Sequence, residues 1–445
     1  MCSFQIPKLL QGVLGQLHQN GFQAYLVGGA VRDLLLGRPI KDWDIATNAR
    51  PENVIPLFER VIPTGIAHGT VTVLMGKLKI EVTTFRGEGT YTDGRHPDRV
   101  EFLDSLEEDL KRRDFTINAM AYDLSTKRII DPYGGTADLS AGLVRAVGNP
   151  IERFLEDGLR PLRAVRFSCV LDFAIEPATL AGIGAALPVF RQVANERVRD
   201  ELLKILSSRH AARGIEALRQ TGLLGEILPE LLPTIGQAQN SFHKHDVYHH
   251  SLECLARGRG DGVLKLAILL HDCGKPQSVG GSAGEHTFYN HERLSAQFAD
   301  DAMLRLRFSR EERERVNALI ANHMFNYEPS WTDGAVRRLV RKVGVERLSD
   351  LWELRRADIW GRGIMVRGAL KNLVLLKKRI EKVISKDSAL KIKDLAINGE
   401  TVMRDLRLAP GPEVGRILDT LLEKVLDDPN INNEFDLKRI LKELA

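Results

Sequence analysis

The sequence predicts an α+β protein in which a small head of mixed strands and helices precedes a long, all-helical remainder. Two observations carry this prediction. Short, alternating, β-branched segments occur within about the first 145 residues, whereas apolar residues recur at helical spacing from about residue 150 onward. The chain has 445 residues, of which 43% are hydrophobic and 27% are charged. This length is sufficient for roughly two to four domains.

The head begins with a strand that leads into a helix. Residues 23–27 (QAYLV) read as a short strand, Gly28 and Gly29 follow, and residues 31–36 show the apolar spacing of a helix. Farther along, residues 70–75 and 79–85 alternate and are rich in β-branched side chains, with a Gly-Lys pair between them. These two segments predict a β-hairpin.

The remainder reads as helices with charged outer faces. Helical periodicity is clearest in residues 196–207, 211–223 and 310–323. The last segment, from about residue 371, is also helical and is broken by a Pro-Gly-Pro run at 410–412.

Composition excludes several classes of protein. No uncharged apolar run approaches the ~20 residues of a membrane helix, and the first residues lack the basic start and apolar block of a secretion signal. The four cysteines, at positions 2, 169, 254 and 273, show no CxxC spacing. We therefore expect no disulfide framework, no cysteine zinc site and a reducing, cytoplasmic location. The net charge of +4 is too small to indicate nucleic acid by itself.

A glycine turn and two carboxylates form the first candidate site. Gly28 and Gly29 lie where the strand becomes a helix, and glycines there let a phosphate approach the backbone. Asp42 and Asp44 are two residues apart, so on a strand they project from the same face and fit one or two Mg²⁺ ions. Glu81, on the predicted hairpin, is a candidate third acid. The alternatives are an ordinary turn and solvated acids at a strand edge.

A second candidate site combines Asp157 with three arginines. Asp157, Arg160, Arg163 and Arg166 are spaced by three, so on a helix they cover one broad face. Arginine presents planar donor forks to phosphates and base edges. Pro161 predicts that the helix begins near Arg160. The alternative is a solvated helix with internal ion pairs.

The run GGAVRDLLLGRPIKDWDIAT (28–47) resembles the nucleotidyltransferase motif of the DNA polymerase β superfamily. Most closely it resembles the class II tRNA nucleotidyltransferases, which comprise CCA-adding enzymes and bacterial poly(A) polymerases. Four further blocks are similar to motifs of that family, and the resemblance covers about residues 23–220. These blocks are the ribose- and triphosphate-binding motif (112–121), the head-to-neck turn (131–139), the base-selecting neck motif (156–167) and the last neck helix (195–201).

The resemblance implies a polymerase-β-like nucleotidyltransferase head (1–147), a helical neck (148–220), an HD-type helical body (221–370) and a helical tail that contacts tRNA (371–445). It implies that Asp42 and Asp44 hold Mg²⁺ and that Asp157 and Arg160 read the Watson–Crick edge of the incoming base. The nucleotide-binding residues it implies are Gly28, Gly29, Arg32, Arg113, Asp157, Arg160, Arg163 and Arg166.

Histidines and aspartates of the helical body form a third candidate site. Residues 246–272 and 351–358 resemble HD-type phosphohydrolases. The matching metal ligands, for a first-row transition metal, are His250, His271, Asp272 and Asp358. His291 and His323 resemble extra histidines of some members. Buried polar residues that cap helices are the alternative. We expect the neighbouring His243, His245 and His249 to lie on the surface or to touch RNA.

The expected function is therefore Mg²⁺-dependent, template-independent addition of C and/or A from CTP and ATP to the 3′ end of tRNA. Residues 64–71 and Gly158 resemble the tRNA-specific branch, and the loop over residues 86–97 has the length that terminal A addition requires. The partners are tRNA and the two nucleotides, without a membrane. Three alternatives stay open: an A-only enzyme, a poly(A) polymerase acting on general RNA, and an HD phosphohydrolase whose head only binds nucleotide.

Overall fold

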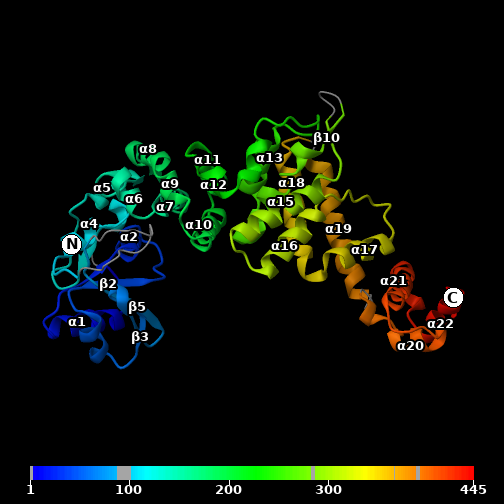
Figure 1. Cartoon of the computed structure of the whole chain (residues 1–445), viewed down its shortest axis with the longest axis horizontal. Helices are drawn as coiled ribbons and strands as arrows, with labels where there is room; N and C mark the ends of the chain where they lie inside the picture. Colours follow the sequence, from blue (N-terminus) through cyan, green and yellow to red (C-terminus); the bar gives the residue numbers. More distant parts are fainter. Residues whose placement is uncertain (1–3, 88–101, 282–285, 365, 387–390, 445) are drawn as a thin grey trace. The chain divides into compact units, whose positions relative to one another are not determined.

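The computed structural model describes residues 4–87, 102–281, 286–364, 366–386 and 391–444. The chain divides into two compact units, Met1–Pro229 and Glu230–Ala445 (Figure 1). A seven-stranded mixed sheet occupies the first part of the first unit and helices dominate the rest, so the α+β prediction is confirmed. Most of the loop over residues 86–97 lies outside the described residues. Among the helices of the described ranges, none has both the length and the apolar composition to cross a membrane.

The head sheet has the strand order β3-β4-β5-β2-β1-β6-β7. β2 is parallel to β5, and the other neighbours are antiparallel. Because β2 is central, the side chains at its start lie between those of β1 and β5. The strands are β1 (Ala24–Val27), β2 (Trp43–Thr47), β3 (Val61–Gly65), β4 (Thr70–Met75), β5 (Leu78–Thr84), β6 (Ala121–Asp123) and β7 (Arg128–Ile130).

Local patterns explain the head elements. The β4–β5 hairpin is confirmed, and its turn contains Gly76 at a φ of +60°, a left-handed conformation that glycine adopts without strain. α2 (Gly29–Leu35) follows β1 directly and begins two residues earlier than predicted. Asp44 lies in β2, but Asp42 precedes it, so the prediction that one strand carries both acids is only half right. The other head helices are α1 (Lys8–Gln19), α3 (Pro51–Val54), α4 (Leu106–Lys111) and α5 (Gly135–Ala141).

The neck of the first unit is built from short helices. α7 begins at Arg160 with Pro161 in its first turn, as the sequence predicts. Asp157, however, lies between α6 and α7 in an extended conformation. The expectation that Asp157 shares a helix face with the three arginines is therefore wrong. The elements here are α6 (Pro150–Glu156), α7 (Arg160–Leu171), α8 (Pro177–Ala185), α9 (Leu187–Phe190), α10 (Asn195–Ser207), α11 (Ala211–Gln220), α12 (Leu223–Ile227), β8 (Leu143–Val144) and β9 (Ala174–Ile175).

The second unit is almost wholly helical in its described part. α14 is uniformly apolar apart from Lys265, and all nine of its residues are buried. The preceding helix α13 and the later helices α16 and α18 pack around it. The elements are α13 (Val247–Arg257), α14 (Gly262–Leu270), α15 (His291–Arg305), α16 (Arg310–Ala321), α17 (Asp333–Val343), α18 (Leu348–Gly361), α19 (Val366–Lys386), α20 (Gly399–Leu406), α21 (Pro412–Asp427), α22 (Glu434–Glu443), β10 (Val279–Gly280) and β11 (Thr287–Phe288).

The last helices have a hydrophobic core of their own. Buried leucines and valines of α20, α21 and α22 form one cluster, which includes Val402, Leu421 and Leu437. α21 starts at Pro412, at the predicted Pro-Gly-Pro break. The division of the chain into head, neck, body and tail stays a prediction within the two observed units.

Candidate functional site

Three carboxylates gather at the centre of the head sheet. Asp44 of β2 and Glu81 of β5 are direct partners in the parallel register, and Asp42 lies two residues before Asp44. Burial, followed by the charge of Glu81, raises the pKa of the Asp44 carboxyl to about 6. Like charges held together at a partly buried position fit a divalent cation, because the cation would offset both their repulsion and their lost hydration.

The glycine turn lets an arginine approach these acids. Gly28 has a φ of +68°, and a Cβ at this position would come within 2.8 Å of the Arg113 guanidinium. Arg113 is held in place by Asp109 of α4, with 3.1 Å between Nη2 and Oδ2. A residue larger than glycine would therefore displace a cation that faces the site.

A hydrogen-bonded chain joins α2 to α7. Arg32 donates to Asn118 Oδ1 at 2.7 Å, and Asn118 donates to Asp114 Oδ1 at 3.0 Å. Asp114 in turn accepts from Arg163 at 2.8 Å. Although burial opposes ionisation, the Arg163 guanidinium holds the pKa of Asp114 below its usual value. Asp114 and Asn118 lie in the predicted ribose- and triphosphate-binding motif (112–121), but neither was predicted as a site residue.

Asp157 and Arg160 are each held by a residue of opposite charge. Asp157 accepts from Arg197 of α10 at 3.1 and 3.3 Å. Arg160 is buried, donates to Glu156 at 2.5 Å and donates to the Arg112 carbonyl at 2.9 Å. These contacts fix both side chains before any ligand binds. Glu156 lies in the base-selecting neck motif (156–167) and Arg197 in the last neck helix (195–201). Neither was predicted to hold Asp157 or Arg160 in place.

Arg166 continues the row of arginines along α7. Its Nε lies 2.5 Å from Glu201 of α10, and its guanidinium lies over the Phe167 ring, 3.8 Å from the centroid. Burial lowers the pKa of Arg166 to about 10. One cleft of about 590 Å³ brings together every residue that the sequence analysis proposed for the head and neck: Gly28, Gly29, Arg32, Asp42, Asp44, Glu81, Arg113, Asp157, Arg160, Arg163 and Arg166.

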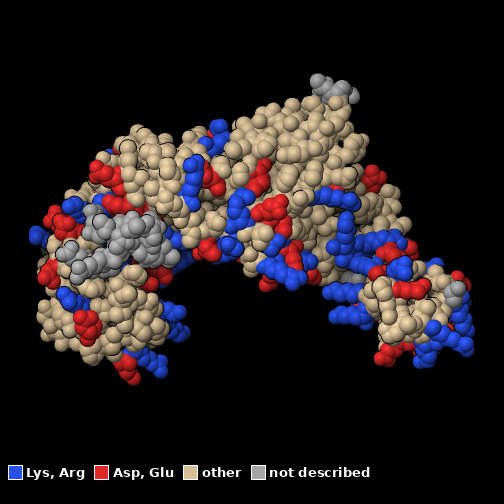
Figure 2. All heavy atoms as spheres, viewed as in Figure 1, with Lys and Arg blue, Asp and Glu red and all other residues tan. Residues whose placement is uncertain are grey.

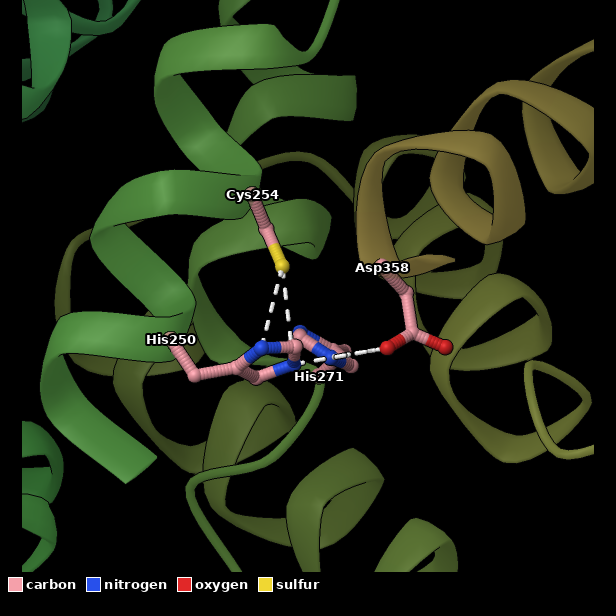
Figure 3. A group of neighbouring side chains, drawn as sticks. All are labelled: His250, Cys254, His271 and Asp358. Atoms are coloured by element: carbon pink, nitrogen blue, oxygen red, sulfur yellow. Dashed lines mark hydrogen bonds and ion pairs between the residues drawn. The ribbon is translucent and has the colours of Figure 1, made fainter. Parts of the chain in front are cut away.

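The second unit contains a buried histidine–aspartate cluster (Figure 3). His250 of α13 points its Nε2 at Asp358 of α18, at 3.3 Å, and at Asp272, at 3.4 Å. His271, which follows α14, lies 3.2 Å from Asp272. Cys254, one turn after His250, brings its thiol to 3.5 Å from the His250 ring. Cys254 was not predicted as part of this site, although its spacing of four from His250 places both on one helix face.

The second oxygen of Asp272 faces two more histidines. Nε2 of His291 lies 3.2 Å from Asp272 Oδ1, and Nε2 of His323 lies 3.7 Å from it. Lys275 and Arg355 form ion pairs with the aspartates, at 2.7 Å to Asp272 and 2.5 Å to Asp358. Asp272 thus lies between two groups of histidines.

Hydrogen bonds orient three of these histidines in the same way. Nδ1 of His271, His291 and His323 lies 2.7–2.8 Å from a backbone carbonyl, so each Nδ1–H donates, and in the neutral ring each Nε2 can act as a ligand. Nε2 of His271, Nε2 of His291 and Oδ1 of Asp272 are buried without a hydrogen-bond partner among the described residues. This donor set fits a first-row transition metal.

The three accompanying histidines differ from one another. His249 is exposed and pairs with Asp246, and His245 is partly exposed. His243, in contrast, is only partly exposed: its ring packs edge-on against His250, with 5.0 Å between centroids, and burial lowers its pKa to about 3. The expectation of a surface position is only partly right for His243, because the chain folds this residue back against α13.

Comparisons with known proteins agree with this geometry. Three family models match the chain: "Poly A polymerase head domain" at residues 24–145, "Probable RNA and SrmB- binding site of polymerase A" at 172–234 and "tRNA nucleotidyltransferase domain 2 putative" at 291–440. Together with the carboxylate cleft, they place the protein in the nucleotidyltransferase class.

The relatives define the family more narrowly. The CCA-adding enzyme of Streptococcus gordonii is 35% identical over 430 residues, which are 95% of this chain and 94% of that protein. The crystal structure of the Bacillus stearothermophilus CCA-adding enzyme in complex with CTP is similar with a TM-score of 0.77, at 31% identity, and covers 99% of this chain and 98% of that one. The chain belongs to the CCA-adding enzyme family.

Other alignments are confined to one half of the chain. The CCA-adding enzyme of Enterococcus faecalis is 51% identical over 209 residues, which are 47% of this chain and 51% of that protein. The chain thus spans about half the length of the relatives that it matches at this higher identity.

Proposed function

We propose that this protein adds C and A from CTP and ATP to the 3′ end of tRNA without a template, and so completes or repairs the CCA terminus. One observation supports the proposal: a single cleft is lined by the three carboxylates and by Asp157 and Arg160, whose side chains are held by Arg197 and Glu156. The first group suits phosphoryl transfer, and the second suits recognition of a base edge. The related enzyme that binds CTP supports the same function.

The reaction joins the 3′ hydroxyl oxygen of the RNA to the α-phosphorus of the nucleotide. The bond between the α-phosphorus and the bridging oxygen to the β-phosphate breaks, pyrophosphate leaves and the hydroxyl proton passes to water. Asp42, Asp44 and Glu81 would hold Mg²⁺, which supplies Lewis-acid charge at the phosphates when it is bound. Arg32 and Arg113 orient the triphosphate, so positioning and electrostatics supply most of the catalysis.

Base choice follows from hydrogen-bonding pattern. Cytosine and adenine both present an amino donor beside a ring-nitrogen acceptor, whereas uracil and guanine present the reverse. Asp157 accepts from the amino group, and Arg160 donates to the ring nitrogen. Glu156 and Arg197 keep the two side chains oriented for this purpose.

The experiment that tests this function sizes the products of nucleotide addition. tRNAs that end before, within and after the CC are offered to CTP and ATP separately. We expect C addition to the first two and A addition to the third. A addition without C addition would identify the A-only alternative, and long A tails on other RNAs would identify a poly(A) polymerase.

Contacts with the body of the tRNA are proposed along the neck and the tail, mainly to phosphates. α19 carries exposed lysines, including Lys371, Lys378 and Lys382, and blue side chains gather over this helix in Figure 2.

The buried free cysteines Cys169, Cys254 and Cys273 support a reducing compartment, so we propose a cytoplasmic location.

A second activity is proposed for the histidine–aspartate cluster. Its donor set favours a metal-dependent phosphohydrolase, with phosphatase or cyclic phosphodiesterase activity, in which His250, His271, Asp272 and Asp358 hold a first-row transition metal and His291 and His323 complete the set. Elemental analysis of the purified chain and hydrolysis of phosphate monoesters and cyclic phosphodiesters test this role. A metal-free, inactive protein after growth with Mn, Fe, Co, Ni and Zn would refute it.

A further inference from the structure

A second cleft, of about 820 Å³, adjoins the nucleotide cleft within the first unit. It lies between α2, the loop after α2, and the ends of α7 and α10. The two clefts share the residues Gly29, Arg32, Asp42, Asp44 and Arg166. Asp42 and Asp44 therefore line both clefts, and so far a ligand has been proposed only for the nucleotide cleft.

Unpaired cations line the second cleft. Arg38, Lys41 and Arg209 are exposed and form no ion pair with a carboxylate in the described part of the chain. Besides Asp42 and Asp44, this cleft is lined by Asp33, which is already paired with Arg32 at 3.0 Å. The cleft thus has an excess of positive charge that the protein does not neutralise, which suits an anionic ligand.

The sheet topology places different charges on the two sides of β2. β2 lies between β5, which carries Glu81, and β1, which leads into α2. Arg32 and Arg166 line both clefts and attract phosphate, whereas Glu81, which repels it, lines only the nucleotide cleft on the β5 side. The β- and γ-phosphates carry most of the negative charge of a nucleotide, so they belong on the α2 side. The second cleft opens there and does not include Glu81.

We propose that the second cleft receives the pyrophosphate that leaves during nucleotide addition; this inference rests on the function proposed above. When the α-phosphorus bond breaks, the bridging oxygen keeps the electron pair, and the leaving group gains one negative charge. Arg38, Lys41 and Arg209 stabilise that charge and draw pyrophosphate away from the carboxylates at which the bond breaks.

Product inhibition tests the proposal directly. Inorganic pyrophosphate is titrated into CTP addition on a tRNA that lacks CCA, with Lys41→Gln, Arg209→Gln and the double variant compared with the unaltered chain. We expect the double variant to raise the inhibition constant of pyrophosphate about three- to tenfold at low salt and to leave the KM for tRNA within about twofold. The difference should shrink at high salt.

Lys77→Gln is the matched control, because Lys77 is exposed in the β4–β5 turn outside both clefts and its loss removes the same charge. This control should leave the inhibition constant unchanged. An unchanged constant in the double variant overturns the proposal, and a raised KM for tRNA in that case assigns the cleft to RNA phosphates. Failure of the unaltered chain to add any nucleotide would instead overturn the proposed function.

Discussion

The raised pKa of Asp44 links the electrostatics of the site to the stability of the protein. Burial and the neighbouring Glu81 both disfavour its charge, so its pKa lies near 6 rather than 3.8. A raised pKa means that folding binds a proton between these values. The stability associated with this carboxyl is therefore present below about pH 4 and is lost as the pH rises through about 6.

Replacing Asp44 by Asn should consequently stabilise the metal-free protein at pH 7.5. We expect a gain of about 1–2 kcal/mol, since one pKa unit corresponds to about 1.4 kcal/mol and partial exposure screens the effect. Thermal melting in EDTA at pH 4 and 7.5 measures it, and the gain should disappear at pH 4. Asp123→Asn is a control of opposite sign, because hydrogen bonds from Ser125 and Thr126 lower the pKa of Asp123 despite burial. A loss of stability in Asp44→Asn at pH 7.5 would contradict the prediction.

Removing the carboxylate of Asp42 or Asp44 should abolish nucleotide addition and leave the affinity for tRNA almost unchanged. Asp42→Ala or Asp44→Ala is expected to stop nucleotide addition and to leave the Kd for tRNA within about twofold, since basic groups elsewhere hold the RNA. Single-turnover addition and filter binding provide the two readouts. Normal extension by the Asp42→Ala, Asp44→Ala double variant would show that this cleft is not the active site.

Asp157→Ala should change base choice rather than catalysis alone. The variant loses the acceptor for the amino group of C and A, and with it about 1–3 kcal/mol of discrimination. The ratio of kcat/KM values for CTP and ATP to those for UTP and GTP should fall. A uniform loss with all four nucleotides would mean that Asp157, through its contact with Arg197, only supports the fold.

At the scale of elements, the join between α6 and α7 depends on close packing against α9. A Cβ at Gly158 would come within 2.7 Å of the Val189 carbonyl oxygen and 3.0 Å of the Phe190 nitrogen. These are backbone atoms, which cannot move aside as a flexible side chain would. Asp157 and Arg160 flank this glycine, so the packing determines where the base-reading pair lies.

Gly158→Ala should therefore displace both of its neighbours. We expect a loss of about 1–3 kcal/mol in stability and at least a tenfold loss in kcat/KM for CTP and ATP. Gly184→Ala in α8 is the matched control, because a Cβ there meets nothing within 4 Å and alanine favours the helix. Full activity of Gly158→Ala would mean that the α9 backbone shifts at little cost and that the packing does not position Asp157 and Arg160.

At the scale of the whole molecule, the two candidate sites lie in different compact units. Asp272→Ala should therefore abolish phosphohydrolysis and reduce bound metal, while nucleotide addition stays within about twofold. Asp272→Asn, which keeps the side-chain volume, guards against unfolding of the buried cluster. Equal loss of both activities in a folded Asp272→Asn protein would show that the two sites are coupled.

Most of the correct predictions from the sequence alone came from short, contiguous motifs. The strand before Gly28, the hairpin at residues 70–84 and the start of α7 at Arg160 are confirmed, because neighbouring residues decide turns, caps and helix starts. The acids at 42 and 44 and the His271-Asp272 pair were proposed for the same reason, since their spacing along the chain is itself chemically informative. The structure brings these residues together, and their roles stay predictions.

Contacts between distant residues could not be predicted in this way. Asp157 lies off the arginine helix and is held by Arg197, 40 residues later, and Arg32 reaches Asn118, 86 residues later. His243 packs against the buried cluster only because the chain folds back onto His250. Periodicity describes which side of an element is apolar, but not which other element will cover it. That choice depends on how the side chains of the whole unit pack, and so only the tertiary structure decided it.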